Sequence, residues 1–311
     1  MFTSEMLITV FSFILAYGFI HFIYKKAKMI IAQNNAIAQF PMEPNNWLIG
    51  HISMIQSTTE KRMRVWTLLH KYPRYMAFRL TFLMPVLAIN HPDIIRQVIR
   101  SNVAKKFINE SIVRPVIGDA LPISTGEKWR NHRKILDRAF HSAMIRSYIK
   151  TTNSCVDILI GIMKKDINAM NCPDVFSDVL DRYIADVVFN CLLSRNENIQ
   201  LNKDTPNTVR NIMKFLTKEL SVRIQSKYLL VEPIYALTQN GKKYKSQIKT
   251  LHEYVEKMIA QRKYKDSHNE DRRSTGDLLD IMLNTVKSDG KLMNDEEIKD
   301  EVECILILNR V

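Results

Sequence analysis

The feature that most restricts what this chain can fold into is the uncharged apolar run from Met6 to Tyr24. As a helix it extends over roughly 28 Å, about the thickness of the hydrocarbon core of a bilayer. Glu5 precedes the run, whereas Lys25, Lys26 and Lys28 follow it. A cleaved signal peptide has its basic residues first and a small-residue cleavage site afterwards, so the run predicts a membrane anchor instead. By the positive-inside rule, we expect the rest of the chain in the cytosol.

After the anchor, the chain changes in composition twice. Residues 25–56 are of mixed polarity, and Pro41 and Pro44 fix φ and disfavour helix, which is typical of a stiff spacer. Apolar periodicity then continues to the end of the chain. The expected organisation is a transmembrane anchor over residues 1–24, a basic, proline-containing connector over 25–56 and one folded domain over 57–311.

The folded domain is predicted to be mainly α, with a small β-hairpin. Only 8 Gly and 10 Pro occur in 311 residues, which argues against a sandwich or a barrel. Residues 75–80 and 85–90 are apolar and partly alternate, which indicates the two strands of the hairpin. The expected helices span about 57–71, 92–100, 126–141, 142–168, 174–194, 208–218, 239–265, 276–286 and 294 onward.

Local start signals support three of these helices. The sequences Ser57-Thr58-Thr59-Glu60 and Ser124-Thr125-Gly126-Glu127 have the spacing of capping boxes. Asn294, followed by three acidic residues, is a further predicted N-cap. The helix that it starts becomes wholly apolar, so we expect it to enter a buried core.

Trp129 and Arg133 lie four residues apart in the second of these helices, so both occupy one face. An indole N–H beside a guanidinium forms a donor pair suited to carboxylates or phosphates. An exposed Trp–Arg stack on an ordinary helix is the alternative interpretation of this spacing.

The formal net charge of +13 predicts acidic partners, such as anionic lipid headgroups, an acidic protein surface or nucleic acid. No zinc-finger, RNP or Gly-rich RNA motif accompanies the basic residues, so we expect no nucleic-acid partner. Cys155, Cys172, Cys191 and Cys304 are far apart and lack metal-ligand spacing. They are typical of buried thiols in a reducing compartment, and we expect neither a disulfide framework nor a metal site.

In their order, these features resemble a microsomal cytochrome P-450, most like the insect branch related to the fatty-acid ω-hydroxylases. The sequence Leu121-Pro122-Ile123-Ser124-Thr125-Gly126-Glu127-Lys128-Trp129, with His132-Arg133-Lys134-Ile135-Leu136 and Ala139-Phe140-His141, looks like the C helix of that family. Asp277-Leu278-Leu279-Asp280 resembles its H region, and Asp295-Glu296-Glu297-Ile298 looks like the start of its I helix. The resemblance implies the N-terminal part of the cytochrome P-450 fold, preceded by one transmembrane helix.

The resemblance also implies a cofactor, a pocket and partners. Trp129 and Arg133 would hold a propionate of haem b, because a buried carboxylate needs charge-assisted donors. Four apolar residues would border a pocket for a lipophilic substrate, although ordinary core packing is an equally open interpretation: Ile112, Val113, Ile117 and Leu121. The basic face would meet an acidic NADPH-dependent reductase at the endoplasmic reticulum membrane.

The departures from the family pattern concern the catalytic parts. No Cys lies in the F-x-x-G-x-x-x-C-x-G setting that supplies the haem thiolate, and no E-x-x-R helix is present. The sequence reads Ile307-Leu308-Asn309-Arg310-Val311 where the oxygen-activating motif of the I helix is expected, with Leu308 where some relatives carry a haem-bonded Glu. We therefore expect a truncated monooxygenase that lacks catalytic and iron-ligating residues and is inactive by itself. The alternative is a non-catalytic, membrane-anchored helical protein that binds a reductase or another partner.

Overall fold

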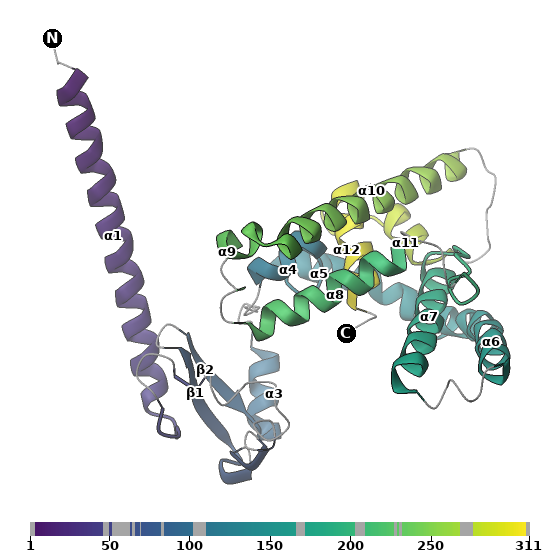
Figure 1. Ribbon diagram of the computed structural model, residues 1–311, viewed down its shortest axis with the longest axis horizontal. Coiled ribbons are helices and arrows are strands. Elements are labelled where there is room, and N and C mark those ends of the chain that lie inside the picture. The colour runs from purple at the N-terminus through teal and green to yellow at the C-terminus, as the bar shows by residue number, and fades with distance from the viewer. Residues whose placement is uncertain are drawn as a thin grey trace. The chain divides into compact units, whose positions relative to one another are not determined.

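The computed structural model of the chain describes residues 4–45, 50–51, 63, 66–68, 70–81, 84–101, 110–165, 172–202, 209–226, 229, 232–267 and 276–308. The chain divides into two compact units, Met1–Val103 and Ala104–Val311 (Figure 1). The capping box predicted at residues 57–60 lies outside the described residues.

The first unit contains a long helix, a hairpin and a short helix. Helix α1 spans Ser4–Ala38, so helix continues well beyond Tyr24 into the region expected to be a connector. The side chains of residues 6–11, which begin the expected anchor, lie outside the described residues. No helix among the described residues combines the length and apolar character that a membrane span needs, so the predicted transmembrane helix is not confirmed.

Strands β1 (Tyr75–Thr81) and β2 (Met84–Ile89) pair antiparallel, which confirms the predicted hairpin. Helix α3 (Pro92–Arg100) follows, and Pro92 begins it as expected because its missing N–H has no partner to lose there. The segment before β1 contacts that strand through His51, whose side chain is 1% exposed. Its Nδ1 accepts the Arg79 N–H at 3.1 Å, and its Nε2 lies 3.1 Å from the Glu43 carbonyl.

The second unit is helical throughout its described elements. These are α4 (Glu110–Ile117), α5 (Gly126–Leu136), the 3₁₀ turn η1 (Asp137–Phe140), α6 (Ser142–Lys165), α7 (Pro173–Leu192), α8 (Val209–Gln225), α9 (Glu232–Leu237), α10 (Gln239–Ser267), α11 (Leu278–Asn284) and α12 (Asp295–Leu308). The mainly α prediction is therefore confirmed. Helices α4 and α9 were not anticipated, because each is short and contains a proline.

Two of the predicted helix starts can be compared atom by atom. At α12, Asn294 caps as expected: its Oδ1 accepts the Glu297 N–H at 2.8 Å, and the Glu297 carboxylate accepts the Asn294 N–H at 2.9 Å. At α5, the predicted capping box is wrong. Thr125 is the N-cap and makes no side-chain cap bond, while the Ser124 hydroxyl donates to the Leu121 carbonyl at 3.3 Å instead.

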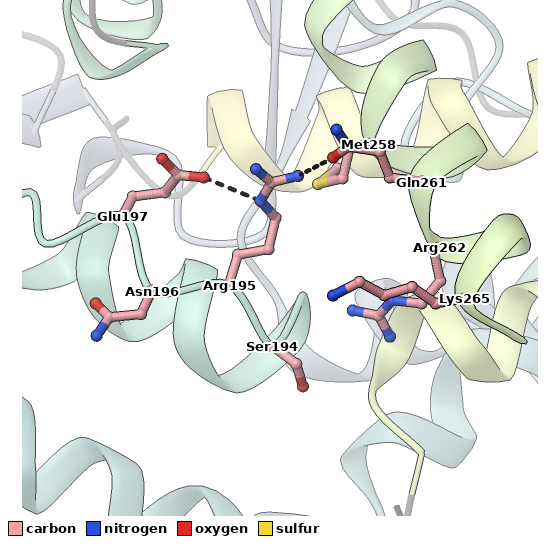
Figure 2. A pocket seen from close by; sticks show the side chains of 8 residues that line it. All are labelled: Ser194, Arg195, Asn196, Glu197, Met258, Gln261, Arg262 and Lys265. Atoms are coloured by element: carbon pink, nitrogen blue, oxygen red, sulfur yellow. Dashed lines mark hydrogen bonds and ion pairs between the residues drawn. The ribbon is translucent and has the colours of Figure 1, made fainter. Parts of the chain in front are cut away.

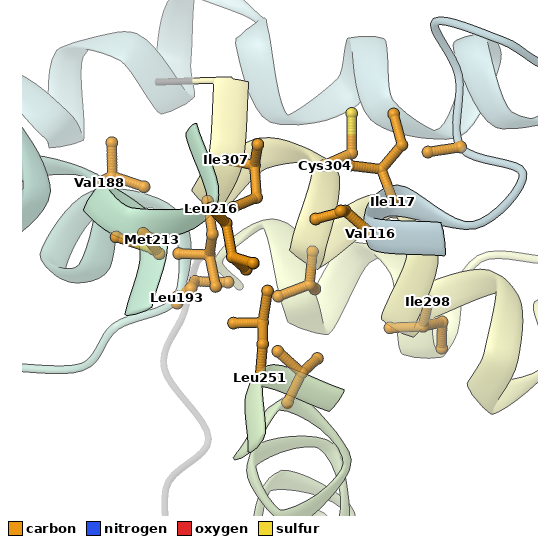
Figure 3. Close-up of a cluster of buried hydrophobic side chains, with 14 of the residues drawn as sticks. Val116, Ile117, Val188, Leu193, Met213, Leu216, Leu251, Ile298, Cys304 and Ile307 are labelled. Atoms are coloured by element: carbon orange, nitrogen blue, oxygen red, sulfur yellow. The ribbon is translucent and has the colours of Figure 1, made fainter. Parts of the chain in front are cut away.

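The apolar core of the second unit forms around α12, as Figure 3 shows. Helices α4, α7, α8 and α10 each direct apolar side chains toward it, and the fully buried members include Val116, Leu216, Leu251, Ile298 and Val302. The expected burial of α12 is confirmed, because only Leu308 among its last seven residues is exposed. This helix is the framework on which the candidate site is held.

Candidate functional site

Helix α5 separates a buried face from an open one. Asn131, His132, Ile135 and Leu136 are buried, whereas Trp129 is half-buried and the Arg133 side chain is 56% exposed. The two predicted donors therefore lie one turn apart on the same helix, at the edge of its open face. Their helical placement agrees with the sequence; their role as haem-propionate donors stays a prediction.

The guanidinium of Arg133 keeps donor capacity for a ligand. Its Nη2 lies 3.0 Å from Asp137 Oδ1, and the side chain of Asp137 is 51% exposed. An ion pair this exposed to solvent contributes little to stability and is readily exchanged for another acid. A guanidinium has five N–H donors in a fork that matches a carboxylate, so one exposed contact does not exhaust it.

The buried face of α5 is joined to α12 by a histidine that the sequence analysis did not single out for this role. His132 is 1% exposed, and its Nδ1 lies 2.6 Å from Glu301 Oε1. The same carboxylate oxygen accepts the Leu121 N–H at 2.9 Å. The Nε2 of His132 lies 3.7 Å from Glu297 Oε1, one turn earlier on α12. The sequence does place acidic residues inside the apolar helix that begins at Asn294. Because a buried carboxylate requires hydrogen-bond donors, this pattern could have predicted a buried donor from another helix.

The loop between α4 and α5 is held by a second acid of α12. Asp300 is buried, and its Oδ2 accepts the Asp119 N–H at 2.8 Å. Gly118 has φ +55°, and a Cβ at that position would lie 1.8 Å from Asp300 Oδ1. Only glycine allows both this left-handed backbone and this close approach. Burial is the main reason why the pKa of Asp300 lies above its usual range.

The four apolar residues predicted to border a substrate pocket lie on α4 and just after it. Ile112, Val113 and Ile117 are 2%, 7% and 1% exposed, and Leu121 is half-buried against the same core. All four pack with the apolar cluster around α12. Core packing accounts for their burial here, and contact with a substrate stays a prediction.

None of the described cysteines has the environment of a metal-bound thiolate. Burial raises the pKa of the Cys304 thiol to about 12 and also raises the pKa values of Cys155 and Cys191. Cys172 is exposed. Within the described part of the chain, no group of three His, Cys, Asp or Glu side chains could hold a metal ion.

A polar cavity of about 350 Å³ lies between the segment after α7 and the C-terminal part of α10 (Figure 2). Three basic residues line it, but two of them are already engaged. Arg195 Nε lies 2.9 Å from Glu197 Oε1, and Arg262 contacts Asp277 at 2.9 Å and donates to the Leu193 carbonyl at 2.7 Å. The charges of Arg195 and Arg262 are compensated within the protein. We therefore interpret this cavity as a polar contact region between the two segments.

The described elements are mainly helical, with one β-hairpin in the first unit. In the second unit, the buried helix α12 is bonded to neighbouring elements through its acidic side chains. The chain belongs to the cytochrome P450 family, whose sequence description matches residues 40–307. Similar proteins include cytochrome P450 4F4 of Rattus norvegicus, 28% identical over 87% of this chain and 53% of that protein. Cytochrome P450 4F2 of Homo sapiens is 29% identical over 86% of this chain and 53% of that protein. Leukotriene-B4 omega-hydroxylase 3 of Mus musculus is 27% identical, with the same two coverages as the human protein.

Solved structures support the fold. The cytochrome P450 CYP102L1 superposes with a TM-score of 0.64 at 17% identity, covering 81% of this chain and 54% of that one. A cytochrome P450DA heme domain superposes with a TM-score of 0.67 at 17% identity, covering 86% and 56%. The chain spans about half the length of the curated relatives that it matches.

Membership of this family implies a haem cofactor, and α5 fits one part of it. The donor chemistry of Trp129 and Arg133 suits a propionate, and the opposite face of α5 is fixed by buried polar contacts. None of the four cysteines lies in the sequence setting of the family's axial thiolate. That Trp129 and Arg133 hold a propionate, and that no cysteine of this chain binds the iron, both stay predictions.

Proposed function

We propose that this chain is the membrane-anchored portion of a haem-thiolate monooxygenase and that Trp129 and Arg133 bind a haem propionate. The observation that carries the proposal is the pairing of these two donors at the open edge of a helix whose other face is fixed to α12. When bound in such a protein, the haem supplies the oxygen chemistry, and the protein contributes binding and orientation. This chain's own part is to hold the carboxylate side of the cofactor.

A lipophilic, fatty-acid-like substrate is the class that we favour. One relative is named as an omega-hydroxylase of leukotriene B4, and it is similar to this chain over 86% of the chain's length. Ile112, Val113, Ile117 and Leu121 supply the apolar side chains that such a pocket needs, and α4 would present them as one wall.

Membrane attachment through α1 belongs to the same proposal. The side chains of Phe13, Tyr17, Phe19 and Tyr24 are each at least 64% exposed, so aromatic surface covers this part of the helix. Basic residues follow the apolar run, as is typical of the cytosolic side of an anchor. We therefore propose a single-pass protein of the endoplasmic reticulum with its folded domain in the cytosol. The net charge of +13 suits an acidic NADPH-dependent reductase as partner.

A second candidate function rests on the cysteines. None of the four cysteines lies in the sequence setting of the family's axial Cys. A membrane-anchored helical protein that binds the reductase without performing oxidation is consistent with this observation. The two candidate functions differ in whether haem binds, and both have the reductase as partner.

The test is a haem titration of the full chain in detergent micelles, followed by reduction and addition of carbon monoxide. The proposal predicts weak but saturable haem binding and no thiolate-type Soret band, because none of the four cysteines lies in the setting of the family's axial ligand. Absence of any saturable binding, together with capture of purified reductase, would support the second candidate. A thiolate-type band would contradict our assignment of the cysteines.

A further inference from the structure

The buried contact between α5 and α12 has a consequence for the donors on the open face of α5. His132 lies between Trp129 and Arg133 in sequence, and its ring is 1% exposed. Each residue of a helix is rotated by about 100° from the one before it, so fixing one side chain fixes the direction of its neighbours. An anchor at His132 therefore determines where the indole and the guanidinium are directed.

The partner of His132 is itself rigidly held. Glu301 is 1% exposed and lies on α12, the most buried helix of the unit. Its Oε1 accepts the Leu121 N–H at 2.9 Å as well as the Nδ1–H of His132 at 2.6 Å. One carboxylate oxygen thus ties together the loop before α5, α5 itself and α12. Removing either side chain leaves a buried polar group without its partner.

A second carboxylate of α12 faces the other ring nitrogen of His132, at a separation too long for a hydrogen bond. Glu297 Oε1 lies 3.7 Å from Nε2 of His132, and Glu297 also bonds to Lys287 Nζ at 3.0 Å. Burial alone would raise the pKa of Glu297, but hydrogen bonds from the Asn294 backbone and from Lys287 outweigh it and lower the pKa. Glu297 therefore stays ionised beside the ring. Both ring nitrogens thus face acids of α12, and the hydrogen bond that holds the ring is the one from Nδ1 to Glu301.

We propose that His132 is a positioning residue: through Glu301 it sets the rotation of α5 and thereby directs Trp129 and Arg133 toward a carboxylate-bearing cofactor. This inference rests on the proposed function for the identity of the ligand. The geometry of the positioning itself involves residues of this chain alone. It can therefore be measured without haem.

The first experiment reports the surroundings of Trp129 directly. In the full chain with Trp47 and Trp66 replaced by Phe, a single 5-fluorotryptophan gives one ¹⁹F resonance. We expect His132→Leu to shift or broaden it, because the side chain keeps its bulk and loses the bond to Glu301. His132→Asn, whose amide N–H can stand in for Nδ1–H, should restore the original resonance. An unchanged resonance in His132→Leu, with the helix content retained, would overturn the proposal.

The second experiment asks whether the positioning matters for the cofactor. The probes are ferric protoporphyrin IX and its dimethyl ester, which lacks the two carboxylates, titrated at the Soret band. We expect the parent chain to prefer the free acid by about tenfold, the value of one charge-assisted hydrogen bond. His132→Leu should abolish this preference, and His132→Asn should keep it.

The outcomes of the two experiments separate the two claims. A parent chain that binds both porphyrins equally would count against Trp129 and Arg133 as propionate donors, and the proposed function would fail. The positioning role would then still be decided by the ¹⁹F resonance. A preference for the free acid that survives in His132→Leu would refute the positioning role and leave the proposed function standing.

Discussion

Helices α12 and α6 of the second unit both follow apolar periodicity in the sequence, yet their surroundings differ. In α12, eight residues are buried, and three of these are acids: Asp300, Glu301 and Glu303. In α6, which is longer, Cys155 alone is buried, and the side chains of Ile145, Ile149 and Ile160 are more than 40% exposed. The difference shows that apolar content alone does not predict burial, because α12 buries three acids while α6 leaves three isoleucines exposed.

The acids of α12 can be buried because each meets a donor from another element. Asp300 accepts the Asp119 N–H, Glu301 accepts from His132, and Glu303 Oε1 lies 2.6 Å from His252 Nδ1 on α10. A buried carboxylate without such partners would cost several kcal/mol. The isoleucines of α6 need no such partner, and in this chain they face outward. The following predictions test this contrast.

The largest effect is expected in the apolar contacts of α12. Ile298 is 0% exposed, so Ile298→Ala should lower the free energy of unfolding by about 2–5 kcal/mol through lost burial and a residual cavity. The matched control is Ile149→Ala on α6, where the side chain is 53% exposed and a change within about 0.5 kcal/mol is expected. Urea unfolding followed by circular dichroism measures both. Equal losses would show that the contrast between the helices is wrong.

A somewhat smaller effect is expected where the loop before α5 meets α12. Gly118→Ala combines a left-handed backbone, at φ +55°, with a Cβ directed onto Asp300, and should cost about 2–4 kcal/mol. Gly290 has φ +78° with no atom near its absent Cβ, so Gly290→Ala should cost only about 1–2 kcal/mol. The difference in urea midpoint isolates the contact with Asp300. Its absence would mean that the loop moves freely away from α12.

The smallest effect concerns the pH dependence of the contact between α10 and α12. The hydrogen bond that His252 donates to the Glu303 carboxylate raises the pKa of His252 above its ordinary value, against the opposing effect of burial. Glu256 and Lys299 also act on this histidine, with opposite signs. Because the folded pKa is raised, the stabilisation is complete below the unfolded pKa and is lost as pH rises through the folded one.

We therefore expect the urea midpoint to fall as the pH rises above about 6.5, the ordinary pKa of histidine. In His252→Gln the fall should be reduced, whereas the exposed His141→Gln should keep the parent profile. A midpoint that rises with pH in the parent chain, or an identical profile in His252→Gln, would contradict the assignment.

The helices, their order and the hairpin could largely be predicted from the sequence, because periodicity and start signals are local. The Asn294 cap was predicted to the residue, whereas the box at Ser124 failed because the Ser124 hydroxyl bonds backward to Leu121. The helix bearing Trp129 and Arg133 was also predictable.

The anchor formed by His132 and Glu301 was not predictable in the same way. These two residues lie far apart in the sequence, and no local pattern pairs a histidine of one helix with an acid of another. Similarly, the four apolar residues on and after α4 could be recognised as buried, but sequence alone cannot distinguish a pocket wall from a core. Only the packing of the elements around α12 brings these groups together.

The most direct test of the account compares two arginines of α5 in the haem titration. Arg133 lies one turn after Trp129, whereas Arg130 is also exposed but lies on a different side of the helix. We predict that Arg133→Ala weakens haem binding by about tenfold, the value of a charge-assisted hydrogen bond. We predict that Arg130→Ala leaves haem binding unchanged. Equal haem affinity in the two variants would contradict the claim that Trp129 and Arg133 form a propionate site.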